Sequence, residues 1–418
     1  MTNHSDIIIA GAGPAGASVS LFLSKQKIPH TIIDSAHFPR DKTCGDGLVP
    51  GVFEVLNHLD ESLSEKLLAS PYVTHSWGGD FISSTEKKYH VDLAPAHYND
   101  ICGFFICKRI HFDYFLFEQL ESPYAKIKTG VKLKDVRRIT DGLSVTLAEG
   151  NMENEHYCKL LIGADGINSV VRKQLGNYDI EKKHYGSFVS AYFRGVRGLA
   201  PNNTAEIRII RKNGMPLYFY IFPLPNDEFN ISLGGINKQI KKRHVNLKEA
   251  LREIIEEHPA VAPQFANAEA SGKIRGWGIP IGAVRRQLVG DHYMLVGDAG
   301  GLVNPFYKEG IAKSMISGWI AAKHIDAAYQ AQQFDNAILR QYERDFYRKC
   351  RWELVASNWL QKIAWSPWWF DRVLQIMNLK TSRRLTLFGL KKAMEIAWKE
   401  RMGREILNPK SEIRNPKS

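Results

Sequence analysis

The stretch DIIIAGAGPAGASVSLFLSKQKIPHTIIDS, residues 6–35, decides the fold. Its β-branched run at residues 7–9 is typical of a parallel strand that is covered on both sides. Three glycines then form a G-x-G-x-x-G turn at Gly11, Gly13 and Gly16. The first permits the tight turn, the second lets a pyrophosphate approach the backbone, and the third lets the helix pack on the strand. The stretch therefore predicts a strand, a phosphate-binding turn and a helix.

An acidic residue closes the second strand of this unit. Asp34 follows the glycines by about twenty residues, where an acid accepts the hydroxyls of an unphosphorylated ribose. This favours FAD or NAD over NADP. The first helical residues supply N–H groups for the phosphates. The residues expected to hold this nucleotide are Gly11, Gly13, Pro14, Ala15, Gly16 and Asp34.

Size and composition describe an ordinary globular protein. The chain has 418 residues, of which 44% are hydrophobic and 24% charged, which indicates two or three domains. The five cysteines have no spacing suited to zinc, so we expect reduced thiols, no metal and a cytoplasmic protein. We find no signal peptide and no apolar run long enough to span a bilayer.

The net charge of +12 is uneven, because residues 380–418 hold 11 Lys and Arg against 4 Glu. Nucleic acid, an anionic membrane surface or plain solvent could face such a tail. No nucleic-acid-binding motif supports the first partner. We therefore expect no nucleic acid and leave peripheral membrane contact open.

Two later motifs point to a flavin. KLLIGADGINSVVRKQLG, residues 159–176, is a buried strand ending at Asp165, and residues 292–322 contain a strand ending at Gly297 and Asp298. A carboxylate at such a strand end can bind a ribityl or ribose hydroxyl. The helix starting at Gly310 and Ile311 can direct N–H groups at the pyrimidine carbonyl of a flavin.

The chain resembles the flavoprotein superfamily that includes the aromatic-ring hydroxylases, and most of all the geranylgeranyl reductase family. The resemblance extends from residue 6 to about residue 325. It is carried by GAGPAG, PRDKTCGDGL, ICKRIHFDYFL, GADGINSVVR, GDAGGLVNPFYKEGI and the aromatic stretch LYFYIFPLPNDEFNISLGG. The resemblance implies an α/β fold: a Rossmann-like (GR2-type) FAD-binding domain, an inserted mixed β-sheet substrate domain and a C-terminal helical segment.

We assign domains on this basis. The discontinuous FAD-binding domain covers residues 1–71, 101–183 and 276–333. The substrate-binding β-sheet domain covers residues 72–100 and 184–275, and residues 334–418 form a helical region with a basic tail. The resemblance adds further residues to the FAD site, namely Arg40, Cys44, Gly45, Arg109, Asp165, Gly297, Asp298, Pro305, Gly310 and Ile311.

Cys44 lies in K-x-C-G-x-G-L, a setting that places a cysteine beside the flavin in the geranylgeranyl reductase family. Lys42 could lower the pKa of this thiol, which could then relay a proton after hydride addition. Alternatively, Cys44 only shapes the cavity, which we favour. Lys308 departs from the family pattern P-x-x-G-x-G by replacing a glycine. It could bring a cation to the flavin edge or point into solvent, and we expect the second.

No second G-x-G-x-x-G is present, so NAD(P)H or a ferredoxin must deliver electrons transiently. The stretch YFYIFP, residues 218–223, lacks the tryptophans of a flavin halogenase, which argues against that activity. Alternating strand patterns predict a substrate sheet above the flavin. Its candidate lining residues are Trp77, Tyr218, Tyr220, Phe222 and Trp277.

Residues beyond about 334 read as helical, with a break at Pro367. Trp352, Val355, Trp359 and Ile363 share a helical stripe that either packs on the flavin domain, as we expect, or contacts a membrane. For Trp368, Trp369 and the basic end both alternatives stay open.

The sequence therefore predicts an FAD-dependent oxidoreductase that reduces C=C bonds of an isoprenoid or another long apolar substrate by hydride from the reduced flavin. A flavin monooxygenase using NAD(P)H and O2 is the first alternative, and a non-catalytic prenyl or lipid carrier the second. The oligomeric state is not predicted.

Overall fold

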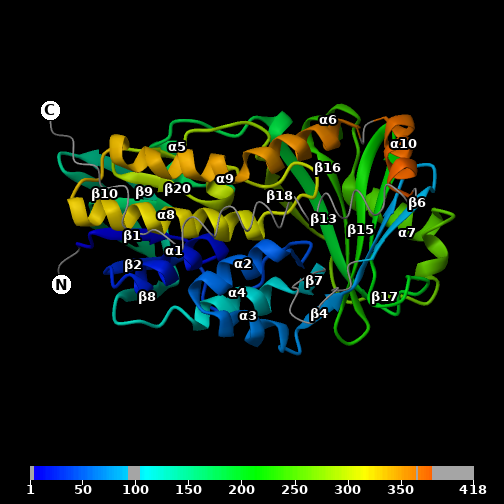
Figure 1. Ribbon diagram of the computed structural model, residues 1–418, viewed down its shortest axis with the longest axis horizontal. Coiled ribbons are helices and arrows are strands. Elements are labelled where there is room, and N and C mark those ends of the chain that lie inside the picture. Colours follow the sequence, from blue (N-terminus) through cyan, green and yellow to red (C-terminus); the bar gives the residue numbers. More distant parts are fainter. Residues whose placement is uncertain (1–3, 93–103, 364–365, 379–418) are drawn as a thin grey trace.

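The computed structural model describes residues 4–92, 104–363 and 366–378 (Figure 1). The predicted basic tail, residues 380–418, lies outside the described residues, as does Cys102. Among the described residues, Cys44, Cys107 and Cys158 form no disulfide.

The chain begins in a six-stranded sheet with the order β19-β20-β12-β1-β2-β8. Its strands are β1 (Ile7–Ala10), β2 (His30–Asp34), β8 (Ala125–Thr129), β12 (Leu160–Gly163), β19 (Val289–Gly290) and β20 (Tyr293–Leu295). β1 is parallel to β2 and β12. Ile7 and Ile9 pack into one core cluster, while Ile8 and Ala10 pack into another. Both sides of β1 are therefore covered, as its β-branched run predicts.

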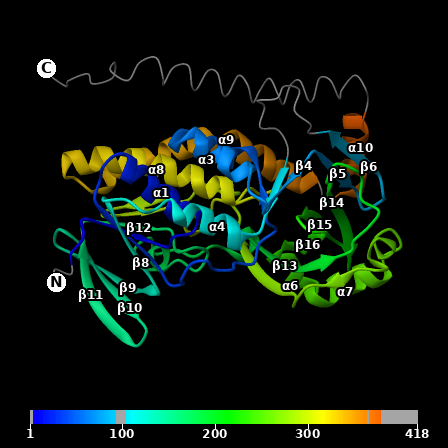
Figure 2. The same cartoon turned by 90° about the horizontal axis from the view of Figure 1, so that it is seen from below.

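The two sides of this sheet have different covers (Figure 2). One side carries α1 (Pro14–Lys25), α2 (Pro50–Leu59), α3 (Glu61–Leu68), α4 (Arg109–Glu118), α8 (Ile311–Ala331) and α9 (Asn336–Ile363). The other side carries α5 (Val170–Gln174) and a three-stranded antiparallel sheet of β9 (Val131–Ile139), β10 (Gly142–Glu149) and β11 (Met152–Cys158). Gly318 of α8 lies so close to α1 that a Cβ would contact the carbonyl oxygen of Ala15 at 2.5 Å. Small residues thus bring the two helices together over the first turn.

A second, eight-stranded mixed sheet forms the other half of the molecule. It contains β5 (Gly78–Ile82), β6 (Lys88–Asp92), β13 (Tyr185–Arg194), β14 (Ala205–Lys212), β15 (Met215–Leu224), β16 (Glu228–Ile236), β17 (Glu269–Ala270) and β18 (Arg275–Pro280). Along β15, Leu217, Phe219 and Ile221 pack in one cluster with α7 (Leu247–Glu257). Tyr218 and Tyr220 point to the opposite side, toward Val303 and the loops of the first half. The period of two along the strand thus places the aromatic side chains between the two halves.

Short elements complete the described chain. A three-stranded sheet of β3 (Gly47–Leu48), β4 (Val73–Ser76) and β7 (Phe104–Cys107) lies between the halves. The remaining helices are α6 (Asn237–Lys242), α10 (Pro367–Asn378), η1 (Lys182–His184), η2 (Ala262–Phe265) and η3 (Gly297–Gly300). The predicted fold class, a Rossmann-like α/β domain with an inserted mixed sheet and C-terminal helices, is confirmed. The predicted domain boundaries stay a prediction.

The C-terminal helices correct one expectation. α9 packs on the first half through Tyr342, Phe346, Cys350 and Leu354. The stripe of Trp352, Val355 and Trp359 is instead 80%, 56% and 63% exposed, so the expected packing through these three residues is wrong. Helix α9 has two neighbouring apolar stripes, one with Phe346, Cys350 and Leu354 and the other with Trp352, Val355 and Trp359. The spacing of apolar residues does not distinguish which of the two is buried. No helix among the described residues has the length and hydropathy needed to cross a membrane.

Candidate functional site

The first glycine turn joins β1 to α1. Gly11 has φ +106°, and a Cβ at this position would collide with the carbonyl oxygen of Ala164. A Cβ at Gly16 would collide with the carbonyl oxygen of Gly11, so both positions require glycine. Asp34 accepts hydrogen bonds from the N–H groups of Ala12, at 2.8 Å, and Ala36, at 2.9 Å. Each carboxylate oxygen keeps a lone pair for a further donor such as a ribose hydroxyl.

The second and third motifs meet this turn, although they are far away in the sequence. Gly11 lies against Ala164 and Asp165 at the end of β12. A Cβ at Gly297, which follows β20, would lie 2.9 Å from the Cβ of Ala15. Gly310 directly precedes Ile311, the first residue of α8. A Cβ at Gly310 would lie 3.5 Å from Oδ1 of Asp298. The structure thus brings the three glycine-acid turns together at one edge of the six-stranded sheet.

Asp165 provides a test of whether a dinucleotide fits here. Its Oδ2 accepts the N–H of Val170 at 2.7 Å. Its Oδ1 is buried and has no hydrogen-bond partner among the described residues. Burial raises the pKa of this carboxyl, although its hydrogen bonds lower it. A buried oxygen without a donor is costly, and a ligand hydroxyl would satisfy it. The residues present therefore fit FAD.

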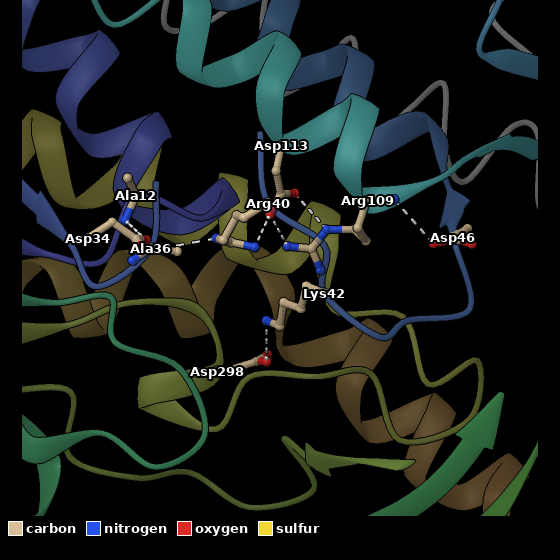
Figure 3. A network of polar contacts seen from close by, with 9 residues as sticks. All are labelled: Ala12, Asp34, Ala36, Arg40, Lys42, Asp46, Arg109, Asp113 and Asp298. Carbon is tan, nitrogen blue, oxygen red and sulfur yellow. Dashed lines mark hydrogen bonds and ion pairs between the residues drawn. The ribbon is translucent and has the colours of Figure 1, made fainter. Parts of the chain in front are cut away.

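A buried charge network lies beside the first turn (Figure 3). Arg109 donates to both oxygens of Asp113 at 2.6 Å, and Nη1 of Arg40 lies 2.9 Å from Oδ2 of Asp113. Arg40 also lies 4.0 Å from Oδ1 of Asp34 and next to Gly13, whose Cβ would be 3.3 Å from Nη2 of Arg40. The arginine pair lowers the pKa of Asp113 against its burial, so this carboxyl stays ionised. The network brings positive charge to the phosphate end of α1.

Lys42 and Cys44 follow this network in the chain. Nζ of Lys42 lies 3.8 Å from Oδ2 of Asp298. Burial raises the pKa of the Cys44 thiol, and the lowering effect of Arg109 exceeds that of Lys42. Lys42 also lowers the pKa of the thiol, as suggested, but by less than burial raises it. The role of the Lys42 and Cys44 pair stays a prediction.

Sequence reasoning missed Asp46, which lies two residues beyond Cys44. Its side chain is fully buried, with φ +64°. Oδ2 accepts the phenolic O–H of Tyr192 at 2.7 Å and the amide of Asn230 at 2.7 Å. Among the described residues, the one donor to Oδ1 is the N–H of Arg109 at 3.3 Å. Burial raises the pKa of this carboxyl to about 6, against the lowering effect of these hydrogen bonds. Asp46 can therefore hold a proton near neutral pH.

The partners of Asp46 come from the second sheet. Tyr192 on β13 and Phe222 on β15 are both paired with Asn230 on β16, so the three side chains share one side of the sheet. The amide of Asn230 also donates to the carbonyl oxygen of Cys44 at 2.8 Å. Two sequence features could have indicated this buried pair: the polar Asn230 inside the apolar run FNISLGG, and the acidic Asp46 between two glycines in CGDG.

Aromatic side chains form a ladder next to this carboxylate. The ring centroids of Tyr218 and Tyr220 are 6.4 Å apart, and those of Tyr220 and Phe222 are 5.4 Å apart. The ring of Phe222 lies where Cβ atoms of Gly45 and Gly47 would contact it, at 3.9 Å and 3.4 Å. The ladder therefore continues to the loop that holds Cys44 and Asp46.

The two predicted lining tryptophans have different positions. Trp277 joins the ladder through Phe188, at 5.6 Å between ring centroids, and Phe188 lies 6.2 Å from Tyr220. Trp77 makes its ring contacts with His75 and Phe105 of the small sheet. Its role as a lining residue stays a prediction.

Lys308 corrects another expectation, because its amine points inward. Nζ lies 4.8 Å from the ring centroid of Tyr218 and donates to the carbonyl oxygen of Pro305 and to Gln361 of α9. Burial lowers the pKa of the amine to about 7. The backbone at Lys308 has φ +58°, where glycine is favoured, which explains the glycine of the family pattern. The expected orientation into solvent is wrong, because the left-handed turn directs the side chain toward the aromatic ladder.

Comparison with known proteins shows which family this chain belongs to. The model of a family described as an FAD binding domain matches residues 4–357. The menaquinone reductase of Mycobacterium tuberculosis is 28% identical over 354 residues, covering 82% of each chain. Digeranylgeranylglycerophospholipid reductase 1 of Methanothermobacter thermautotrophicus is 27% identical over 354 residues, again covering 82% of each chain.

Among solved structures, a geranylgeranyl bacteriochlorophyll reductase-like protein from Thermoplasma acidophilum has the same fold. It superposes with a TM-score of 0.78 at 18% identity, covering 91% of this chain and 93% of that one. These matches confirm the resemblance that the sequence motifs indicate.

Proposed function

The chain belongs to the FAD-binding-domain family, and from that premise we propose that it reduces C=C bonds of an isoprenoid or another long apolar substrate. Membership in this family makes the protein an FAD-dependent oxidoreductase. The names of its menaquinone and digeranylgeranylglycerophospholipid reductase relatives support the isoprenoid class of substrate.

The three turns supply the groups that would hold FAD. Gly11, Gly13 and the start of α1 offer backbone to the pyrophosphate, and Asp34 offers carboxylate oxygens to the ribose. Oδ1 of Asp165 and the carboxylate of Asp298 offer acceptors to further hydroxyls. Reduced FAD in this site supplies a hydride to the substrate.

The observation that carries the proposal is the position of Asp46. This buried acid follows Arg40 and Lys42, which contact Asp34 and Asp298. It also accepts hydrogen bonds from Tyr192 and Asn230 of the second sheet. Saturating a double bond requires a proton on one carbon as well as a hydride on the other. Oδ1 of Asp46 has one weak donor and is the oxygen that can hold this proton.

The aromatic ladder suits an apolar substrate. Tyr218, Tyr220 and Phe222 form a continuous apolar wall beside Asp46. Such a wall excludes water from a reacting double bond and orients a polyprenyl chain. In the proposed reaction the π bond would break and two C–H bonds would form, with the hydride supplied by bound reduced FAD and the proton by Asp46. NAD(P)H or a ferredoxin returns the electrons.

Anaerobic single turnover tests this function. The holoenzyme is photoreduced without oxygen and mixed with a polyprenyl diphosphate or menaquinone, while flavin absorbance and product mass are followed. We expect flavin reoxidation in step with a product whose polyprenyl chain, and not only its quinone ring, has gained two hydrogens. Reoxidation with an unchanged polyprenyl chain would refute the proposal. A purified protein without flavin would favour the carrier alternative instead.

A further inference from the structure

The C-terminal helices carry an exposed aromatic surface. Trp352 and Trp359 on α9 are 80% and 63% exposed, and Trp368 and Trp369 on α10 are each 57% exposed. Together with Val355, which is 56% exposed, they form what we call the tryptophan surface. Large apolar side chains with this exposure are costly in water, so four exposed tryptophans on two consecutive helices indicate a binding surface.

Packing among the residues that the structure describes does not explain these side chains. α9 buries Phe346, Cys350 and Leu354 against the first half of the molecule, on the stripe next to Trp352 and Trp359. In α10, Phe370 is buried in the cluster of Tyr218 and Tyr220. The tryptophans therefore contribute little to the core and remain available for a partner.

Basic residues accompany the tryptophan surface. Arg351 and Lys362 of α9 are exposed, and the guanidinium of Arg372 lies 5.5 Å from the ring centroid of Trp368. The sequence that follows α10, residues 380–418, holds 11 Lys and Arg against 4 Glu. Tryptophan prefers the headgroup level of a bilayer, and each basic residue near an anionic surface adds about 1 kcal/mol of attraction. Basic residues beside tryptophans favour a membrane surface that contains anionic lipid over an uncharged apolar partner.

The tryptophan surface is connected to the aromatic ladder. Phe370 follows Trp369 directly and packs in the cluster of Tyr218 and Tyr220. Gln361, two residues beyond Trp359, accepts the hydrogen bond of Lys308, whose amine lies over Tyr218. The tryptophan surface is therefore linked to the ladder through Phe370 of α10 and Gln361 of α9.

We infer that the tryptophan surface docks the protein on a bilayer containing anionic lipid, next to the route by which an apolar substrate reaches the aromatic ladder. The inference rests on the proposed function for the substrate route, and on exposure and charge for the docking itself. Docking would bring the aromatic ladder close to the apolar interior of the bilayer, where a polyprenyl substrate is dissolved.

Vesicle flotation of the full-length holoenzyme tests this inference. The wild type should float with phosphatidylglycerol-containing vesicles, more weakly with pure phosphatidylcholine, and less as salt rises. The double variants Trp352→Ser/Trp359→Ser and Trp368→Ser/Trp369→Ser should partition about tenfold more weakly. Met152→Ser, at a residue 66% exposed on β11, is the matched control and should float like the wild type.

Three results would overturn the inference. The wild type could stay in solution, or the double variants could float like the wild type. Light scattering could also show a dimer of the wild type that is lost in Trp352→Ser/Trp359→Ser. The last result would assign the surface to a second copy of the chain.

Turnover of a short, water-soluble polyprenyl substrate without vesicles separates this inference from the proposed function. The double variants should turn over this substrate like the wild type. Vesicle binding without turnover by any variant would support docking and count against the proposed function.

Discussion

The phenolic O–H of Tyr192 donates to Oδ2 of Asp46 at 2.7 Å, and this contact connects β13 of the second sheet to the loop before β3. Asp46 is fully buried, and its partners Tyr192 and Asn230 come from two strands of the second sheet. The two halves of the molecule thus share one titratable group. Its raised pKa, about 6, makes its protonation sensitive to pH in the physiological range.

We predict that Asp46→Asn slows flavin reoxidation in anaerobic single turnover about a hundredfold or more, because general acid catalysis contributes on that scale. In the wild type the rate should fall as pH rises through about 6, where the carboxyl loses its proton. In the variant this inflection should disappear. Stopped-flow measurements over a pH series check both results, with bound flavin quantified to confirm an intact site.

Tyr192→Phe provides the matched control for this prediction. The hydrogen bond from Tyr192 lowers the pKa of Asp46, so its removal should move the inflection to higher pH without abolishing it. An inflection that stays in place in Tyr192→Phe, or persists in Asp46→Asn, would assign the titration to another group.

We predict that Cys44→Ala keeps the pH inflection near that of the wild type and changes the rate constant by less than about tenfold. Burial raises the pKa of this thiol, so we expect Cys44 to stay protonated and only to shape the cavity. The KM for the apolar substrate should change instead. Loss of the inflection in Cys44→Ala would show that the thiol relays the proton.

We predict that Asp113→Ala lowers the free energy of unfolding by about 3–5 kcal/mol, because it leaves the buried guanidinium of Arg109 without this counter-charge. Arg109 is 4% exposed and depends on Asp113 for both of its charge-assisted hydrogen bonds. Urea denaturation of the apoprotein measures this loss. Asp135→Ala, which removes a partner of the exposed Arg137, should cost less than about 1 kcal/mol. Equal losses in the two variants would contradict the structural role of the network.

We predict that Lys308→Met removes a pH dependence of stability. The pKa of Lys308 in the folded protein, about 7, lies below the ordinary value of 10.5. The unfolded chain therefore binds more protons between these values, so the unfolding free energy should rise with pH above about 7. Lys308→Met should flatten this rise, whereas Lys323→Met, at an exposed position of α8, should not. Parallel curves for the wild type and Lys308→Met would contradict an inward amine.

The three glycine-acid turns could be predicted from the sequence because backbone geometry dictates their residues. Gly11 and Gly16 tolerate no Cβ, and each turn follows a strand of the same sheet. Asp46 could not be found this way, since its partners lie on β13 and β16, more than 140 residues away. Lys308 was misjudged because its direction depends on φ +58° and on Gln361 of a later helix. Trp352 and Trp359 were misjudged because helical spacing does not distinguish which of two apolar stripes is buried.

Product analysis after turnover under isotopically labelled dioxygen tests the central claim most directly. The holoenzyme, its electron donor and a polyprenyl substrate are incubated with the labelled gas, and the product is examined by mass spectrometry. The account predicts a product that has gained two hydrogens for each saturated double bond and carries no labelled oxygen. A product that contains labelled oxygen and keeps its double bonds would contradict the account and identify the protein as a monooxygenase.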